Sequence, residues 1–157
     1  MITYDSVRTF LEGHRIALVG ASDAKDSFAR TIDRALVDHG YEVLPVNPRL
    51  AELDGRPCYP SVMDIPEPVD GAIIMVGSDH ARRVVDDVAA AGVERVWLFK
   101  GLGSQGAATP DVIEACQRHG LQTVAGACPL MFLEPVGAGH RMHRTVRAWR
   151  GALERSA

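Results

Sequence analysis

Cysteine is scarce in this sequence, which has only Cys58, Cys116 and Cys128 among its 157 residues. The first residues are polar and lack the basic and apolar regions of a signal peptide. An odd number of cysteines without an export signal predicts reduced thiols and a cytoplasmic protein. Long apolar runs are also missing, because the longest, such as residues 71–77, have the length of a strand. This length excludes a membrane-spanning helix, so we expect no membrane partner.

An excess of positive charge is missing too. The 17 Lys and Arg residues stand against 20 Asp and Glu residues, which gives a formal net charge of −3. A chain with this balance has no global basic field to attract nucleic acid, so we expect no nucleic-acid partner.

Recognisable catalytic and metal-binding sets are absent as well. Cys128 has no histidine close in sequence, which favours a small, buried, structural cysteine over a nucleophile. His140 and His143 are three residues apart, but no third ligand is evident, so we predict no metal site. Without paired carboxylates or a Ser-His-Asp set, the sequence favours a binding module and leaves enzymatic activity open.

Short apolar segments alternate with amphipathic segments, several of which end at a glycine. This pattern predicts parallel β-α-β units in one Rossmann-like α/β domain, with a doubly wound five-stranded sheet and helices on both faces. We expect one domain over residues 1–157, with a core of about 14–135 and a basic C-terminal helix of about 140–154. The expected strands are 15–20, 41–46, 71–76, 95–99 and 121–125. The other expected helices are 4–13, 28–39, 79–91 and 110–119, and residues 47–60 are expected to form a loop.

The turn after the first expected strand is a candidate phosphate site. Gly20, Ala21 and Ser22 stand between that strand and helix 28–39, where backbone N–H groups and the helix dipole favour an anion. Ser22 can donate a hydrogen bond to phosphate, and Lys25 or Arg30 can pair with its charge. Only Gly20 matches the three glycines of a dinucleotide fingerprint, and a turn that Ser22 merely caps is the alternative.

The end of the second expected strand has no carboxylate. Asn47, Pro48 and Arg49 stand where an NAD site places Asp or Glu against the ribose hydroxyls. A carboxylate would repel a phosphorylated ribose, whereas Arg49 would attract one. This favours NADP or a 3′-phosphorylated adenosine over NAD, although an ordinary loop arginine explains the same residue.

Two further strand ends offer candidate residues. Val76 and Gly77 follow the third strand, and Ser78 is expected to cap helix 79–91. Phe99 and Lys100 follow the fourth strand in a glycine-rich stretch that is too irregular for a P-loop. The ligand is expected at these carboxyl ends, near the point where the strand order reverses.

Four segments in a fixed order resemble the small, stand-alone CoA-binding proteins, which are similar to the N-terminal domain of the succinyl-CoA synthetase α subunit. They are Ile-Ala-Leu-Val-Gly-Ala-Ser at 16–22, Gly-Tyr-Glu-Val-Leu-Pro-Val-Asn-Pro at 40–48, Val-Trp-Leu at 96–98, and residues 120–129 ending in Cys-Pro. The resemblance implies CoA phosphates at 20–22, the adenosine end near 47–49, and a cleft bordered by 76–78 and 99–100. Two segments depart from that pattern: Phe99-Lys100 replaces Gln-Leu, and Gly126-Ala127 replaces Asp-Arg.

Together these observations predict a module that binds coenzyme A or an acyl-CoA without catalytic machinery. Two alternatives stay open. One is an NADP-dependent oxidoreductase that uses Lys100 or His80 as its acid or base. The other is a subunit of a larger acyl-CoA synthetase. The protein partners left open are a second copy of the chain and a synthetase subunit.

Overall fold

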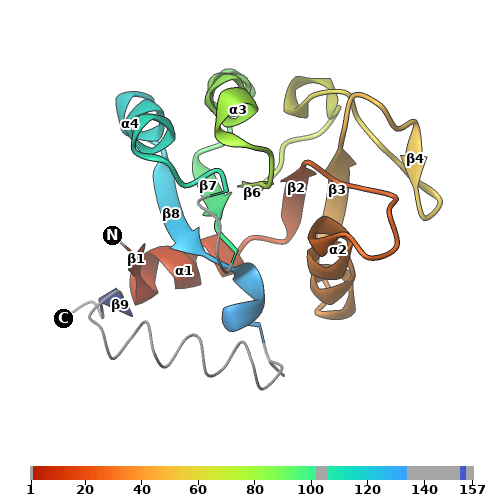
Figure 1. The fold of residues 1–157 in the computed structure, drawn as a ribbon, viewed down its shortest axis with the longest axis horizontal. Helices are drawn as coiled ribbons and strands as arrows, with labels where there is room; N and C mark the ends of the chain where they lie inside the picture. Colours follow the sequence, from red (N-terminus) through yellow and green to blue (C-terminus); the bar gives the residue numbers. More distant parts are fainter. Residues whose placement is uncertain (1, 102–105, 134–152, 155–157) are drawn as a thin grey trace.

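The computed structural model describes residues 2–101, 106–133 and 153–154, and its centre is a five-stranded parallel sheet (Figure 1). The strand order is β3-β2-β6-β7-β8. This confirms the predicted Rossmann-like parallel sheet. The five strands are β2 (Arg15–Val19), β3 (Glu42–Val46), β6 (Gly71–Ile74), β7 (Arg95–Phe99) and β8 (Gln122–Ala127).

Helices cover both faces of the sheet, as predicted (Figure 1). One face packs against α1 (Tyr4–Leu11) and α2 (Phe28–Asp38). The other packs against α3 (Ser78–Ala90) and α4 (Pro110–Arg118). No helix in the described part of the chain is long and apolar enough to cross a membrane.

The two apolar cores follow from the alternation of side chains along each strand. In β2, Ile16 and Leu18 face the core under α1 and α2, while Ala17 and Val19 face the core under α3 and α4. All four are buried, because a parallel strand covered on both faces has no solvent side. Trp97 in β7 is fully buried, and its indole N–H donates to the carbonyl of Ala127 at 3.0 Å.

The segment between β3 and β6 is more ordered than the loop expected over 47–60. It contains a hairpin of β4 (Glu52–Leu53) and β5 (Arg56–Pro57), followed by the 3-10 turn η1 (Val62–Asp64). Asp54 and Gly55 both have positive φ, 50° and 76°, which is the conformation of the tight turns that join two antiparallel strands. The expectation of a plain loop was wrong here, because strands of two residues carry no readable periodicity.

The helix predictions differ from the structure at several points. Each of α1 to α4 ends one or two residues before the predicted end. Gly77, not Ser78, is the N-cap of α3, and Ser78 is its first helical residue. The predicted basic helix 140–154 lies outside the described residues except for β9 (Leu153–Glu154), which is a strand paired in parallel with β1 (Ile2–Thr3). The helix prediction is therefore wrong for those two residues.

The three cysteines are free and buried. Cys128 precedes the 3-10 turn η2 (Pro129–Met131), and burial raises the pKa of its thiol to about 11. A thiol with so high a pKa stays protonated near neutral pH and is a poor nucleophile. The structural interpretation of Cys128 from sequence agrees with this environment.

Candidate functional site

The strand order reverses at β2, which places a switch point at its carboxyl end. The chain leaves β2 toward β3 on one side, while β6 pairs on the other side. Gly20 begins the turn at this point with φ +94°, and a Cβ there would lie 3.2 Å from the backbone of Met75 and from the side chain of Val76. Only glycine fits this conformation and this close approach without strain. The connections that leave the carboxyl ends of β2 and β6 run to opposite sides, toward β3 and β7, and leave space for a ligand between them.

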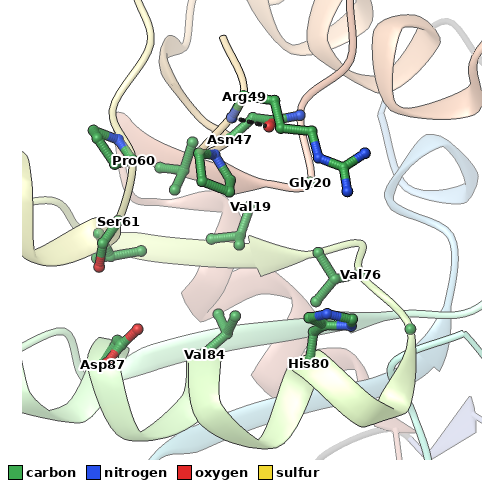
Figure 2. A pocket seen from close by; sticks show the side chains of 14 residues that line it. Val19, Gly20, Asn47, Arg49, Pro60, Ser61, Val76, His80, Val84 and Asp87 are labelled. Carbon is green, nitrogen blue, oxygen red and sulfur yellow. Dashed lines mark hydrogen bonds between the residues drawn. The ribbon is translucent and has the colours of Figure 1, made fainter.

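A pocket of about 430 Å³ opens at this switch point (Figure 2). Its walls come from the end of β2, the chain on both sides of the β4–β5 hairpin, and the stretch from the end of β6 into α3. The lining residues are Val19, Gly20, Val46, Asn47, Pro48, Arg49, Pro60, Ser61, Val62, Val76, Gly77, His80, Val84 and Asp87.

The pocket is apolar in its middle and polar at its two ends (Figure 2). Val19 and Val84 face each other across the middle, and Ser61 and Asp87 lie together at the left end of the view. Arg49 and His80 lie toward the right end. A ligand with an apolar, flat centre and different polar groups at its ends matches this layout.

Six of the thirteen residues predicted to bind the cofactor line this pocket. They are Gly20, Asn47, Pro48, Arg49, Val76 and Gly77. The other seven lie outside its lining: Ala21, Ser22, Lys25, Arg30, Ser78, Phe99 and Lys100.

The turn after β2 is tied to β3 by its own backbone. The N–H groups of Gly20 and Ala21 both donate to the carbonyl of Val46, at 3.0 and 3.3 Å. Ala21 is also buried. These bonds occupy two of the N–H groups expected to face a phosphate, which narrows the predicted anion contact to Ser22 and the residues after it.

Ser22 does not cap the following helix. Its hydroxyl oxygen accepts from the N–H of Ala24 at 3.2 Å, within the turn. The cap of α2 is Ser27, whose hydroxyl oxygen accepts from the N–H of Arg30 at 3.2 Å. The Ser22 hydroxyl proton remains available for donation to a ligand, because this bond uses only the oxygen as acceptor.

Arg30 and Lys25, both predicted to pair with phosphate, have different surroundings. The Arg30 side chain is only 12% exposed, and its guanidinium pairs with Asp54 in the hairpin at 2.6 Å. Lys25 is exposed on the turn. The structure thus gives Arg30 a carboxylate partner already, and Lys25 is the more accessible cation of the two.

Asn47 links two walls of the pocket. Its side-chain amide donates to the carbonyl of Ala21 at 2.7 Å, and its side-chain oxygen accepts from the N–H of Arg49 at 2.8 Å. Its backbone N–H donates to the carbonyl of Tyr59 at 2.9 Å. Asn47 therefore shapes the pocket through both ends of its side chain.

Arg49 is exposed at the pocket mouth. Within the described residues, no carboxylate lies within ion-pair distance of its guanidinium. Its charge is thus available to an anionic group of a ligand.

Phe99 and Lys100 lie at the end of β7, and β6 separates that strand from β2. The Phe99 ring packs at 5.5 Å, centroid to centroid, against Phe28, which begins α2 and is 42% exposed. This aromatic pair lies at the same carboxyl edge of the sheet as the pocket but outside its lining.

Eight lining residues were not among those predicted to bind the cofactor, and one of them, His80, was expected only as an acid or base in the oxidoreductase alternative. Val19 and Val46 are the last residues of β2 and β3, and Pro60, Ser61 and Val62 follow the hairpin. His80, Val84 and Asp87 are spaced as one face of helix α3. That spacing predicts that the three residues share one face of the helix, but packing decides which face adjoins the pocket.

Two ion pairs fasten the hairpin to α2. Arg56 pairs with Asp33 through two bonds, at 3.0 and 2.6 Å, and also donates to the carbonyl of Val43 at 3.1 Å. Asp33 is 1% exposed, and its hydrogen bond is the main reason why the pKa of Arg56 is raised. The second pair is Arg30 with Asp54. Together they fix the segment that carries one wall of the pocket.

The fold and the pocket define a Rossmann-like α/β domain with its candidate site at the switch point, a place where such folds bind nucleotide-like cofactors. The family model described as the CoA binding domain matches residues 14–134, and the chain belongs to that family. Its relatives include N-terminal parts of ADP-forming acetate–CoA ligases, related to the α domain of succinyl-CoA synthetase.

Three similar proteins illustrate this family. Acetate–CoA ligase [ADP-forming] I of Archaeoglobus fulgidus is 35% identical over 118 residues, which are 72% of this chain and 17% of the ligase. A hypothetical protein from Pyrococcus horikoshii OT3 is 31% identical with a TM-score of 0.73, covering 80% of this chain and 84% of that one. The dinucleotide-forming acetyl-coenzyme A synthetase 1 of Ca. Korarchaeum cryptofilum, in its apo form, is 32% identical with a TM-score of 0.60. It covers 70% of this chain, and the match spans 25% of the synthetase.

Proposed function

We propose that this chain binds coenzyme A or an acyl-CoA, with the adenosine part in the pocket at the switch point. The observation that carries the proposal is that pocket, at the carboxyl ends of β2, β3 and β6 in a member of the CoA-binding domain family. A pocket of about 430 Å³ accommodates a nucleoside rather than all of CoA. The rest of the cofactor then extends along the carboxyl edge of the sheet.

Arg49 is the proposed partner of the 3′-phosphate. It lines the pocket, and no carboxylate among the described residues neutralises it. A guanidinium binds phosphate through parallel hydrogen bonds as well as through charge. This contact distinguishes CoA from NAD, which has no phosphate on its ribose.

The diphosphate and the pantetheine arm are proposed to follow the sheet edge away from the pocket. Ser22 offers a hydroxyl and Lys25 an exposed ammonium to the diphosphate. Beyond them, Phe28 and Phe99 present an apolar pair, with Lys100 next to it in sequence, for the pantetheine arm or an acyl group. These roles concern four of the seven predicted residues that lie outside the pocket lining.

The chain is proposed to act as a binding module in the cytoplasm. Of the described pocket residues, His80 and Asp87 lie at opposite ends of the pocket in Figure 2, so they do not form an acid–base pair. The three free thiols support a reducing compartment. The larger relatives suggest that a synthetase subunit is a partner, because this chain spans only 17% and 25% of two of them.

Thermal unfolding with CoA, dephospho-CoA, NADP and NAD tests the proposal. At about 100 times its dissociation constant, a ligand bound only by the folded state adds roughly 2.7 kcal/mol, or several degrees for a domain of this size. We expect this shift with CoA, and a smaller one with dephospho-CoA. A shift with NADP and none with CoA would overturn the proposal in favour of an oxidoreductase.

The variant Arg49→Ala sharpens the same test. We expect it to weaken CoA about five- to tenfold and to leave dephospho-CoA almost unchanged, because only CoA has the 3′-phosphate. Isothermal titration with both ligands measures this. Arg118→Ala, at the far end of α4, is the matched control and should change neither affinity. Equal losses for both ligands in Arg49→Ala would refute the 3′-phosphate contact.

A further inference from the structure

The end of the pocket opposite Arg49 carries two polar side chains from distant parts of the chain. Ser61 precedes η1, and Asp87 lies on the third turn of α3 (Figure 2). Both are half-buried. In the described part of the chain, the Asp87 carboxylate has neither an ion-pair nor a hydrogen-bond partner. A half-buried carboxylate on a pocket wall without a protein partner is placed to accept hydrogen bonds from a ligand.

The hydroxyl of Ser61 complements that carboxylate. Its oxygen accepts from the N–H of Met63 at 3.2 Å, which leaves its proton free to be donated into the pocket. Ser61 and Asp87 therefore offer one donor and one acceptor at the same end of the pocket. The amino edge of adenine has the matching pair, since its 6-amino group donates and its adjacent ring nitrogen accepts.

The middle of the pocket suits a flat heterocycle. Val19 and Val84 lie between the two polar ends (Figure 2), Val46 and Val62 also line the pocket, and Val19, Val46 and Val62 are at most 5% exposed. With phosphate drawn to Arg49, the far edge of the base is directed toward Ser61 and Asp87. The charges at the two ends thus fix the direction in which a nucleotide enters.

We propose that Asp87 and Ser61 read the amino edge of the adenine base and make the pocket selective for adenine over hypoxanthine. This inference rests on the proposed binding of CoA. Hypoxanthine has a carbonyl oxygen in place of the amino group. That oxygen would face the Asp87 carboxylate, so a hydrogen bond is lost and two acceptors are brought together.

Isothermal titration with adenosine 3′,5′-bisphosphate and inosine 3′,5′-bisphosphate tests the selectivity. We expect the wild-type chain to bind the adenosine form at least about tenfold more tightly, which corresponds to one hydrogen bond to a charged group. Asp87→Asn keeps the size of the side chain but adds a donor that suits the carbonyl of hypoxanthine. This variant should lower the adenosine-to-inosine ratio about tenfold.

The matched control is Asp86→Asn, the neighbouring residue on α3. Asp86 does not line the pocket, and its carboxylate pairs with His119 at 2.7 Å, so replacing that carboxylate should leave the ratio unchanged. If only Asp87→Asn lowers the adenosine-to-inosine affinity ratio, the result supports recognition of the adenine amino edge by Asp87. A purely structural effect on α3 would weaken both nucleotides equally.

The outcomes separate this inference from the proposed function. If the wild-type chain binds CoA but binds the two bisphosphates with equal affinity, the proposed selectivity for adenine is overturned and the proposed CoA binding stands. No binding of CoA or of either bisphosphate would overturn both. The wild-type ratio needs no variant, so it decides the matter even if Asp87→Asn fails to fold.

Discussion

The two walls of the pocket are held in place by different forces. The wall formed by α3 rests on apolar packing, since Ala81, Val85 and Val88 are fully buried against the sheet. The opposite wall, residues 47–62, is fixed largely by polar links. Asn47 binds the turn after β2, and Arg56 binds Asp33 of α2. One wall therefore depends on area removed from water, and the other on particular pairs of atoms.

This difference affects how each wall responds to change. Loss of one methyl group from an apolar wall lowers the free energy of unfolding only modestly, because neighbouring side chains still exclude water. Loss of one partner from a buried ion pair leaves a charge without compensation in a poorly solvated place. We expect the wall with less apolar packing to be the more sensitive to a single substitution.

Arg56→Ala should produce the largest loss of stability. It removes both bonds to Asp33, which is 1% exposed, and leaves that carboxylate buried and unpaired. We expect a loss of about 3 kcal/mol in urea unfolding, together with weaker CoA binding because residues 47–62 lose their anchor. The double variant Asp33→Leu, Arg56→Met should regain most of the stability. If Arg56→Ala were neutral, the polar links would not be what holds this wall.

Val85→Ala should have a smaller effect, confined to stability. Val85 is fully buried between α3 and the sheet, and its side chain is absent from the pocket lining. Removing two methyl groups and leaving a small cavity should cost about 2 kcal/mol. Urea unfolding measures the loss, and titration of the folded variant with CoA should give the wild-type affinity. If Val85→Ala weakened CoA binding as much as Arg56→Ala does, the proposed difference between the two walls would be wrong.

The smallest loss of stability is expected at the amino ends of the strands, which lie opposite the pocket. The Asp70 carboxylate accepts from the N–H groups of His14 and Arg15, at 2.7 and 2.9 Å. These bonds lower the pKa of Asp70 below its usual value of 3.8. Its contribution to stability is therefore complete above about pH 4. It disappears as the pH falls through the lowered, folded-state pKa.

Asp70→Asn tests this contribution. The variant should be slightly less stable than the wild type at pH 6, and the difference should shrink as the pH falls below about 4. Urea unfolding across this pH range measures the difference, and CoA affinity at pH 7 should be unchanged. A constant difference down to the lowest pH would mean that the ionised carboxylate is not the cause.

Much of the scaffold could be predicted because it depends on local patterns. Continuous apolar runs such as Gly71–Ile74 indicated buried parallel strands, and glycines such as Gly40 marked the ends of helices. The β4–β5 hairpin could not be predicted in this way, since its strands have two residues each and it is fastened by ion pairs across 23 and 24 positions of sequence. The position of the Gly77 cap differed by one residue, within the usual uncertainty of helix ends.

The candidate site was only partly predictable for the same reason. Gly20, Asn47 and Arg49 follow strands, and parallel strands end at one edge of a sheet, so their proximity followed from the fold class. Ser61 and Asp87 have no such signal, because one follows a hairpin and the other lies on a helix face. Arg30 seemed available for phosphate in the sequence, but Asp54 takes up its charge in the folded chain.

The sequence by itself determined the order of the five sheet strands and of helices α1 to α4, the glycine turn at residue 20 and the absence of a carboxylate after the second core strand. These features depend on residue type and on spacing within one element. The tertiary structure alone decided which side chains share the pocket, which cations are already paired and which face of α3 lines the site. These features arise when elements far apart in the chain pack together, and packing fixes distances that no local pattern contains.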